Sequence, residues 1–140
     1  MIEILNIEIA KLYIDNTKQI FHFEIKSNKY NEEQFLILID YFKNFWILAN
    51  EASNKYYMLI DIKNIGYYPL DVYTKLVDML RSLEEIFKKC LNSSCILIEN
   101  KLAVNILKPI LSVYKSIRPV TFINTYEEAI IFYSQPENSL

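Results

Sequence analysis

The sequence predicts an α/β fold, a single mixed sheet of about five strands with about four helices packed against it. Two observations predict this class. Segments with the two-residue repeat of strands alternate with segments of helical period from one end of the chain to the other. Each later strand also returns through a helix, which favours right-handed crossovers and parallel pairing after an N-terminal antiparallel hairpin. We expect one domain over residues 1–134, followed by a frayed tail over residues 135–140.

The N-terminal segments carry strand patterns. Residues 2–9, IEILNIEI, predict an edge strand or an extended lead-in. Residues 11–25 predict a β-hairpin, because two alternating arms flank the turn sequence DNTK. On the second arm, His22 shares the more polar face with Glu24. We therefore interpret His22 as a solvated strand residue rather than a catalytic one.

The next segment carries the pattern of an amphipathic helix. Asn31 can cap its first turn, and Gln34 follows three residues later, as in a capping box. The side chains that recur at helical spacing, and that we interpret as core rather than as a ligand site, are Phe35, Leu38, Ile39, Phe42, Trp46 and Ala49.

A strand, a turn and a helix follow. Residues 55–62, KYYMLIDI, form a continuous apolar run that is typical of a central strand covered on both faces. Gly66 is the only glycine of the chain, and we expect it to supply a positive φ or room for the neighbouring tyrosines. Pro69 suits the first position of a helix. That helix is predicted to end at a loop over residues 92–94, NSS.

The C-terminal third repeats the order of strand and helix. CILIEN over residues 95–100 and PVTFI over residues 119–123 predict strands. Residues 101–117 between them predict a helix that Pro109 kinks or breaks. A last helix is predicted to begin at Thr125, which has a glutamate three residues later, as in a capping box.

The composition excludes several classes of function. A net charge of −2 does not favour nucleic acid as a partner. One glycine and one histidine cannot build a phosphate-binding glycine loop or a histidine-rich metal site, so we predict no cofactor and no metal. No apolar run approaches the ~18 residues of a membrane span. Acidic residues near the start do not fit a signal peptide, so a cytoplasmic location is expected.

The reactive residue types give no catalytic constellation. Cys90 and Cys95 lack the spacing of a redox pair or a zinc site, and we interpret both as buried apolar residues. Asp61 ends a strand and is the best single carboxylate candidate, although such a residue more often caps the following turn. The sequence therefore predicts that the chain is not an enzyme.

The element order, with YYMLIDIKNIGYYPLDVYTKLVDML leading into SCILIEN, resembles the STAS family over roughly residues 11–133. Those are the sulfate-transporter and anti-sigma-factor-antagonist domains. The resemblance implies a regulatory domain, in which the antagonists carry a phosphorylatable serine in an Asp-Ser-Ser/Thr-Gly-Leu motif. Aligning LIDI with the apolar strand of the family puts residues 69–73, PLDVY, on that motif.

This chain departs from the family motif at its key positions. Pro69 replaces the acidic residue, Leu70 replaces the phosphoacceptor, and Val72 stands where the glycine would be. The resemblance therefore implies a regulatory domain without the usual phosphorylatable serine. Asp71 either resembles a permanent negative charge at the switch site or simply favours the dipole of the helix that begins there.

Together these patterns predict a non-catalytic domain that works through protein–protein contacts. The surface expected to contact a protein partner or a second copy consists of Tyr67, Tyr68, Leu70, Asp71 and Thr74. The two tyrosines can instead pack over the end of the sheet. As an alternative function, the aromatic residues, 14% of the chain, can line a pocket for a small molecule or a lipid.

Overall fold

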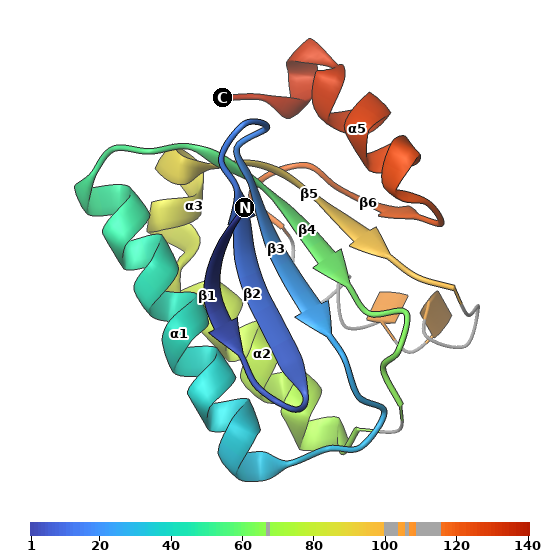
Figure 1. Cartoon of the computed structure of the whole chain (residues 1–140). Helices are drawn as coiled ribbons and strands as arrows, with labels where there is room; N and C mark the ends of the chain where they lie inside the picture. The colour runs from blue at the N-terminus through green and yellow to red at the C-terminus, as the bar shows by residue number, and fades with distance from the viewer. Residues whose placement is uncertain (67, 100–103, 106, 109–115) are drawn as a thin grey trace.

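The computed structural model describes residues 1–66, 68–99, 104–105, 107–108 and 116–140, and Figure 1 shows their arrangement. The elements are, in chain order, β1 (Ile2–Asn6), β2 (Ala10–Asp15), β3 (Ile20–Ile25), α1 (Glu32–Glu51), β4 (Tyr56–Asp61), α2 (Leu70–Ser82), α3 (Glu84–Cys90), β5 (Leu91–Leu97), β6 (Val120–Ile123), α5 (Tyr126–Ser134) and a 3-10 helix (Pro136–Asn138). The predicted α/β class with one mixed sheet is confirmed. The described residues contribute 6 strands to that sheet, slightly more than expected.

The strands lie in the order in which they occur in the sequence, β1-β2-β3-β4-β5-β6. β1, β2 and β3 pair antiparallel, whereas β3, β4, β5 and β6 pair parallel. Because every parallel strand is added on the same side of its predecessor, right-handed crossovers place their helices on one face of the sheet. Figure 1 shows α1, α2 and α3 together, with α5 apart from them.

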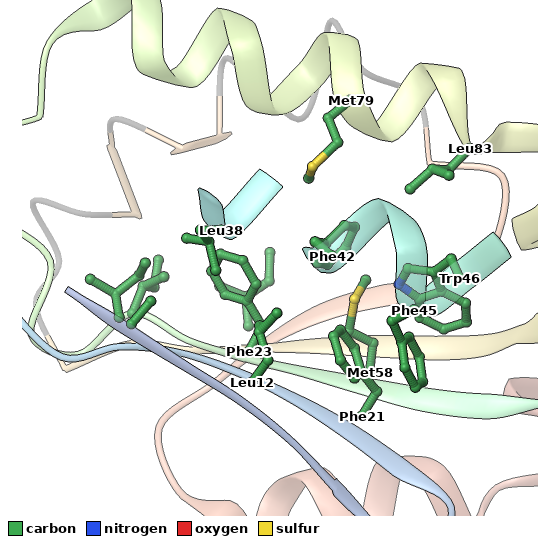
Figure 2. Close-up of a cluster of buried hydrophobic side chains, with 14 of the residues drawn as sticks. Leu12, Phe21, Phe23, Leu38, Phe42, Phe45, Trp46, Met58, Met79 and Leu83 are labelled. Atoms are coloured by element: carbon green, nitrogen blue, oxygen red, sulfur yellow. The ribbon is translucent and has the colours of Figure 1, made fainter. Parts of the chain in front are cut away.

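The larger core lies between the sheet and helices α1, α2 and α3, and Figure 2 shows its aromatic centre. Trp46 is 0% exposed, and its ring meets those of Phe21, Phe45 and Phe87 edge to face. Phe21 stacks on Phe45 with ring centroids 4.0 Å apart. Such aromatic pairs contribute about 0.5–1.5 kcal/mol each beyond the area they bury. β3, α1 and α3 are therefore held together at one aromatic junction.

The predicted N-cap of helix α1 is confirmed, although the side chain of Gln34 does not complete the capping box. The side-chain oxygen of Asn31 accepts a hydrogen bond from the backbone N–H of Gln34 at 3.0 Å. The side-chain oxygen of Gln34 accepts a second hydrogen bond, from the backbone N–H of Ile9 at 3.0 Å, which ties the helix to the segment before β2. Five members of the predicted apolar stripe are buried and Ile39 is half-buried, so the interpretation of this stripe as core is confirmed.

The opposite face of the sheet packs against α5. Met58 and Leu59 are neighbours on β4, and their side chains point to opposite faces: Met58 belongs to the larger core and Leu59 to the smaller one. Tyr133 of α5 is buried in the smaller core, where its hydroxyl donates to the carbonyl of Met58 at 2.5 Å. The predicted cap of α5 is confirmed, because the Thr125 side chain accepts from the Glu128 N–H at 3.3 Å.

Two predictions about the middle of the chain are wrong. Residues 92–94 form part of β5 and not a loop. Asparagine and serine disfavour strands, but β5 pairs with β4 on one side and with β6 on the other, and this context overrides local propensity. The helix after Pro69 is also interrupted, because α2 ends at Ser82 and Leu83 separates it from α3.

Residues 135–140, which the sequence predicts to be a frayed tail, form hydrogen bonds with the rest of the fold. Asn138 is 4% exposed, and its side-chain amide donates to the carbonyl of Phe132 at 2.8 Å. The backbone N–H of Leu140 donates to the side-chain oxygen of Asn92 at 2.8 Å, which fastens the end of the chain to β5. The kink predicted at Pro109 lies outside the described residues.

Candidate functional site

The elbow between β4 and α2, residues 62–74, carries the surface predicted from the sequence. Asp61 at the end of β4 opens it, and the Asp61 Oδ1 atom accepts a hydrogen bond from the backbone N–H of Lys63 at 3.1 Å. The Asp61 Oδ2 atom lies 3.7 Å from Lys63 Nζ. The capping role of Asp61 is therefore confirmed, and its carboxylate is engaged by the turn that it begins.

Gly66 is required in the elbow by a close approach of two backbone segments. A Cβ atom at this position would lie 2.3 Å from the carbonyl oxygen of Asn28, closer than real Cβ contacts ever come. The φ of Gly66 is not positive, so the expected left-handed conformation is wrong. Room is indeed needed there, for the backbone at Asn28.

We expect the substitution Gly66→Ala to lower the free energy of unfolding by about 1–3 kcal/mol, because the chain must separate two backbone segments to admit one methyl group. Urea unfolding followed by circular dichroism measures this loss. Asn64→Ala, at an exposed position of the same turn, is the matched control and leaves stability nearly unchanged. Equal midpoints for Gly66→Ala and wild type would contradict the close approach.

Tyr68 belongs to the core and not to the predicted surface. Its side chain is 8% exposed, its ring lies 5.4 Å from that of Tyr30, and its hydroxyl donates to the carbonyl of Ser27 at 3.1 Å. Burial raises the pKa of this hydroxyl. This burial agrees with the alternative that the ring of Tyr68 packs over the end of the sheet, and it does not favour Tyr68 as a contact residue. Tyr67 lies outside the described residues.

Three predicted contact residues do share the exposed start of α2. Leu70 is 76% exposed, and Asp71 and Thr74 are exposed beside it. Asp71 Oδ2 lies 3.8 Å from Lys75 Nζ, one turn further along the helix. The charge of Asp71 is therefore partly compensated, in a surface pair worth about 0.3–0.5 kcal/mol.

His22 is buried, so its interpretation as a solvated residue is wrong. It is 7% exposed, because α5 returns over this face of the sheet, which the alternation along one strand does not reveal. The ring of Tyr13 stacks on it at 4.3 Å, and that of Tyr126 from α5 lies 6.2 Å away. Burial lowers the pKa of His22 to about 4. Within the described part of the chain, its Nε2 atom has no hydrogen-bond partner.

The two cysteines are buried, as the sequence predicts. Cys90 is 2% exposed and Cys95 is 0% exposed, and both are free thiols. Burial raises the pKa of both thiols, that of Cys95 to about 11. Since the thiolate is the reactive form, neither side chain is a ready nucleophile at neutral pH.

An apolar cavity of about 100 Å³ lies beneath α2. The described residues that line it expose no polar atoms to the cavity, and they come from the sheet, α1, α2, the elbow and Leu107. The side chains around it include Phe23, Phe42, Ile60, Tyr73 and Met79. Its volume compares with the ~150 Å³ of an engineered apolar cavity that stays dry and binds benzene.

The outer face of α1 carries an exposed apolar surface that the sequence analysis missed. Seven residues between positions 36 and 48 are exposed and share one side of the helix, and we call them the α1 outer face: Leu36, Ile37, Asp40, Tyr41, Asn44, Ile47 and Leu48. Five of them are large and apolar, with exposed fractions of 37–53%. The signal was present in the sequence, as apolar residues left over once the core stripe was assigned.

A groove of about 400 Å³ runs along one side of the α1 outer face. Tyr41, Asn44 and Leu48 line it from the helix, and Ile4 and Ile14 line it from β1 and β2. The apolar surface of α1 therefore continues onto the β1 edge of the sheet. A contiguous apolar surface of this kind typically marks an interaction site.

The structure and the known proteins give few further indications of function. The described residues contain no group of three or more His, Cys, Asp or Glu side chains placed to hold a metal ion. Among these residues, no helix combines the length and the apolar character needed to cross a membrane. No protein-family model, curated protein or solved structure matches the chain. The resemblance to STAS domains therefore stays a prediction, based on element order and the elbow sequence.

Proposed function

We propose that this chain is a non-catalytic, STAS-like regulatory domain of the cytoplasm that works by binding protein through the α1 outer face. One observation carries the proposal: five large apolar side chains are exposed together on one helix. Burying apolar surface stabilises a complex by about 25 cal/mol per Å², so such a face gains most from a protein partner. Aromatic and aliphatic side chains with few charges are also typical of the centre of an interface.

The contacts, burial and pKa values of the candidate catalytic residues support a role without catalysis. Asp61 is engaged by the turn that it caps. His22 lies between two tyrosine rings with its pKa lowered to about 4, so it is a weak base and is shielded from a substrate. Cys95 has a raised thiol pKa and no exposure. Each group thus lacks the access or the protonation state that a reaction at neutral pH needs.

The elbow supplies a second contact surface in this proposal. Leu70, Asp71 and Thr74 are exposed at the start of α2, at the place where the STAS resemblance puts the family switch. Three residues make only a small surface, whereas the α1 outer face is larger and more apolar. We therefore rank the elbow below α1 as a site of protein contact.

The cavity beneath α2 favours a small apolar ligand as the second candidate function. Its volume of about 100 Å³ falls below the ~300–1,000 Å³ of typical ligand pockets. A lipid chain does not fit such a space, although a ligand of the size of benzene does. This difference in volume places ligand binding behind protein binding.

Site-specific photo-crosslinking in cells tests the proposed function. A photoreactive phenylalanine analogue replaces Ile47 on the α1 outer face in one variant and Ile131 on α5, which is 63% exposed, in the control. We expect a reproducible crosslinked protein, identified by mass spectrometry, from position 47 and not from position 131. The same products from both positions, or none from position 47, would rule out α1 as the binding surface.

A further inference from the structure

We propose that the α1 outer face binds the same face of a second copy of this chain, so that the two α1 helices pair antiparallel about a two-fold axis. This inference rests on the proposed function and names the partner. The carrying observation is that six of the seven exposed positions of the α1 outer face mirror one another about the level of Phe42, while the seventh, Tyr41, lies level with the half-buried Lys43. Such a pattern suits a two-fold interface, in which residue i contacts residue j of the second copy while j contacts i, because it brings side chains of the same kind together.

The apolar residues of the face match one another in this arrangement. In an antiparallel pair centred at Phe42, Leu36 lies level with Leu48 of the second copy, and Ile37 lies level with Ile47. All four are exposed in the single chain, by 37–53%. Apolar side chains therefore lie opposite apolar side chains of the second copy on both sides of the two-fold axis.

The polar residues of the face also match. Asp40 lies level with Asn44 of the second copy, whose side-chain amide is a donor suited to a carboxylate. Asp40 and Lys43 are the only charged residues between positions 36 and 48, and they have opposite signs. Antiparallel pairing brings Asp40 within one residue of the level of Lys43 across the axis. Parallel pairing would instead oppose Asp40 to itself and Lys43 to itself, which is unfavourable.

The ends of the face carry one mismatch, which gives the proposal a specific consequence. Glu33 lies level with Glu51 of the second copy, and both are exposed. At an exposed rim such like charges cost only a few tenths of a kcal/mol each. The substitution Glu51→Lys reverses the charge at one of these positions. Because the two-fold axis repeats the Glu33–Glu51 pair, both repulsions become attractions. The same change also places a favourable positive charge at the C-terminal end of α1.

The size of the surface sets the expected strength of the dimer. The largest apolar patch of a typical monomer covers ~300–600 Å², and the α1 outer face contributes five large apolar side chains to a patch of this kind. A standard stable interface buries about 800 Å² per partner, so this pair lies at the weak end. We therefore expect a dimer that dissociates with a constant in the range of about 10–100 μM.

Sedimentation velocity of the full chain over a wide concentration range tests the inference. We expect the 16.7 kDa monomer to convert to a dimer as concentration rises. Ile47→Lys places a charge in the apolar contact and is expected to weaken association about tenfold or more. Ile131→Lys, on α5, is the matched control and leaves association unchanged. Glu51→Lys is expected to tighten association about three- to fivefold.

Several outcomes would overturn the dimer. They are a wild-type chain that stays monomeric at every concentration, equal effects of Ile47→Lys and Ile131→Lys, and weaker association for Glu51→Lys. Circular dichroism establishes that each variant is folded. If the wild type stays monomeric while crosslinking from position 47 captures another protein, the second copy is wrong and the protein-binding role stands. If neither experiment finds a contact, both proposals fall.

Discussion

Truncating the buried tryptophan, Trp46→Ala, is expected to lower the free energy of unfolding by about 3–5 kcal/mol. The indole is 0% exposed and contacts aromatic rings from β3, α1 and α3, so its removal leaves a cavity at their junction. A domain of this size has about 5–15 kcal/mol of stability in total, so the variant would be close to unfolding at ambient temperature.

Urea unfolding followed by far-ultraviolet circular dichroism measures this effect, because Trp46 is the only tryptophan and its fluorescence is lost with it. Ile131→Ala is the matched control. It also removes a large apolar side chain, but one that is 63% exposed, and it should cost well under 1 kcal/mol. Similar losses in the two variants would contradict the central place of Trp46 in the core.

The second large effect is a loss of stability in acid caused by His22. Burial lowers the pKa of His22 from 6.5 in the unfolded chain to about 4 in the folded one. Between these values the unfolded state binds more protons, so stability falls as the pH falls. The stability is fully present above pH 6.5 and is lost as the pH falls toward 4, by about 3 kcal/mol in total.

The groups around His22 determine that its pKa is lowered and not raised. Desolvation lowers its pKa most, the charge of Lys18 lowers it further, and the charge of Asp15 opposes both. Tyr13 from β2 and Tyr126 from α5 cover the ring on its two sides. Burial raises the pKa of Tyr13 to about 12, so this neighbour stays neutral throughout the acid range.

Comparison with His22→Phe isolates the contribution of His22, because other groups also titrate in acid. Phenylalanine keeps a ring between the two tyrosines and removes the titrating nitrogens. We expect the wild type to lose about 3 kcal/mol more than the variant between pH 6.5 and 4, measured by urea unfolding at each pH. Parallel pH profiles for the two proteins would show that folding does not lower the pKa of His22.

The parts of the fold that local patterns determine could be predicted from the sequence. Asn31 and the apolar stripe of α1 predict a capped helix with one buried face, and both features are present. The apolar run of β4 predicts a covered central strand. These predictions succeed because periodicity and capping depend on residues that are close in the sequence.

The remaining features depend on elements that come from elsewhere in the chain. His22 is buried because α5 returns over its strand, and residues 92–94 are a strand because β4 and β6 lie on either side. Tyr68 of the predicted contact surface is buried because the chain near Ser27 accepts its hydroxyl. The α1 outer face was missed for a different reason. When a helix has apolar residues on two sides, the periodicity of the sequence indicates only the more strongly apolar side.

The order of the strands bears on how the chain is made. Each strand pairs with the strand that immediately precedes it in the sequence, from β1 to β6. The parallel pairs still join residues far apart in the sequence, such as Phe21 and Met58, so this strand order does not by itself make folding fast. As the chain leaves the ribosome, each new strand finds its neighbour already synthesised, and the sheet can grow from its N-terminal hairpin in the direction of translation.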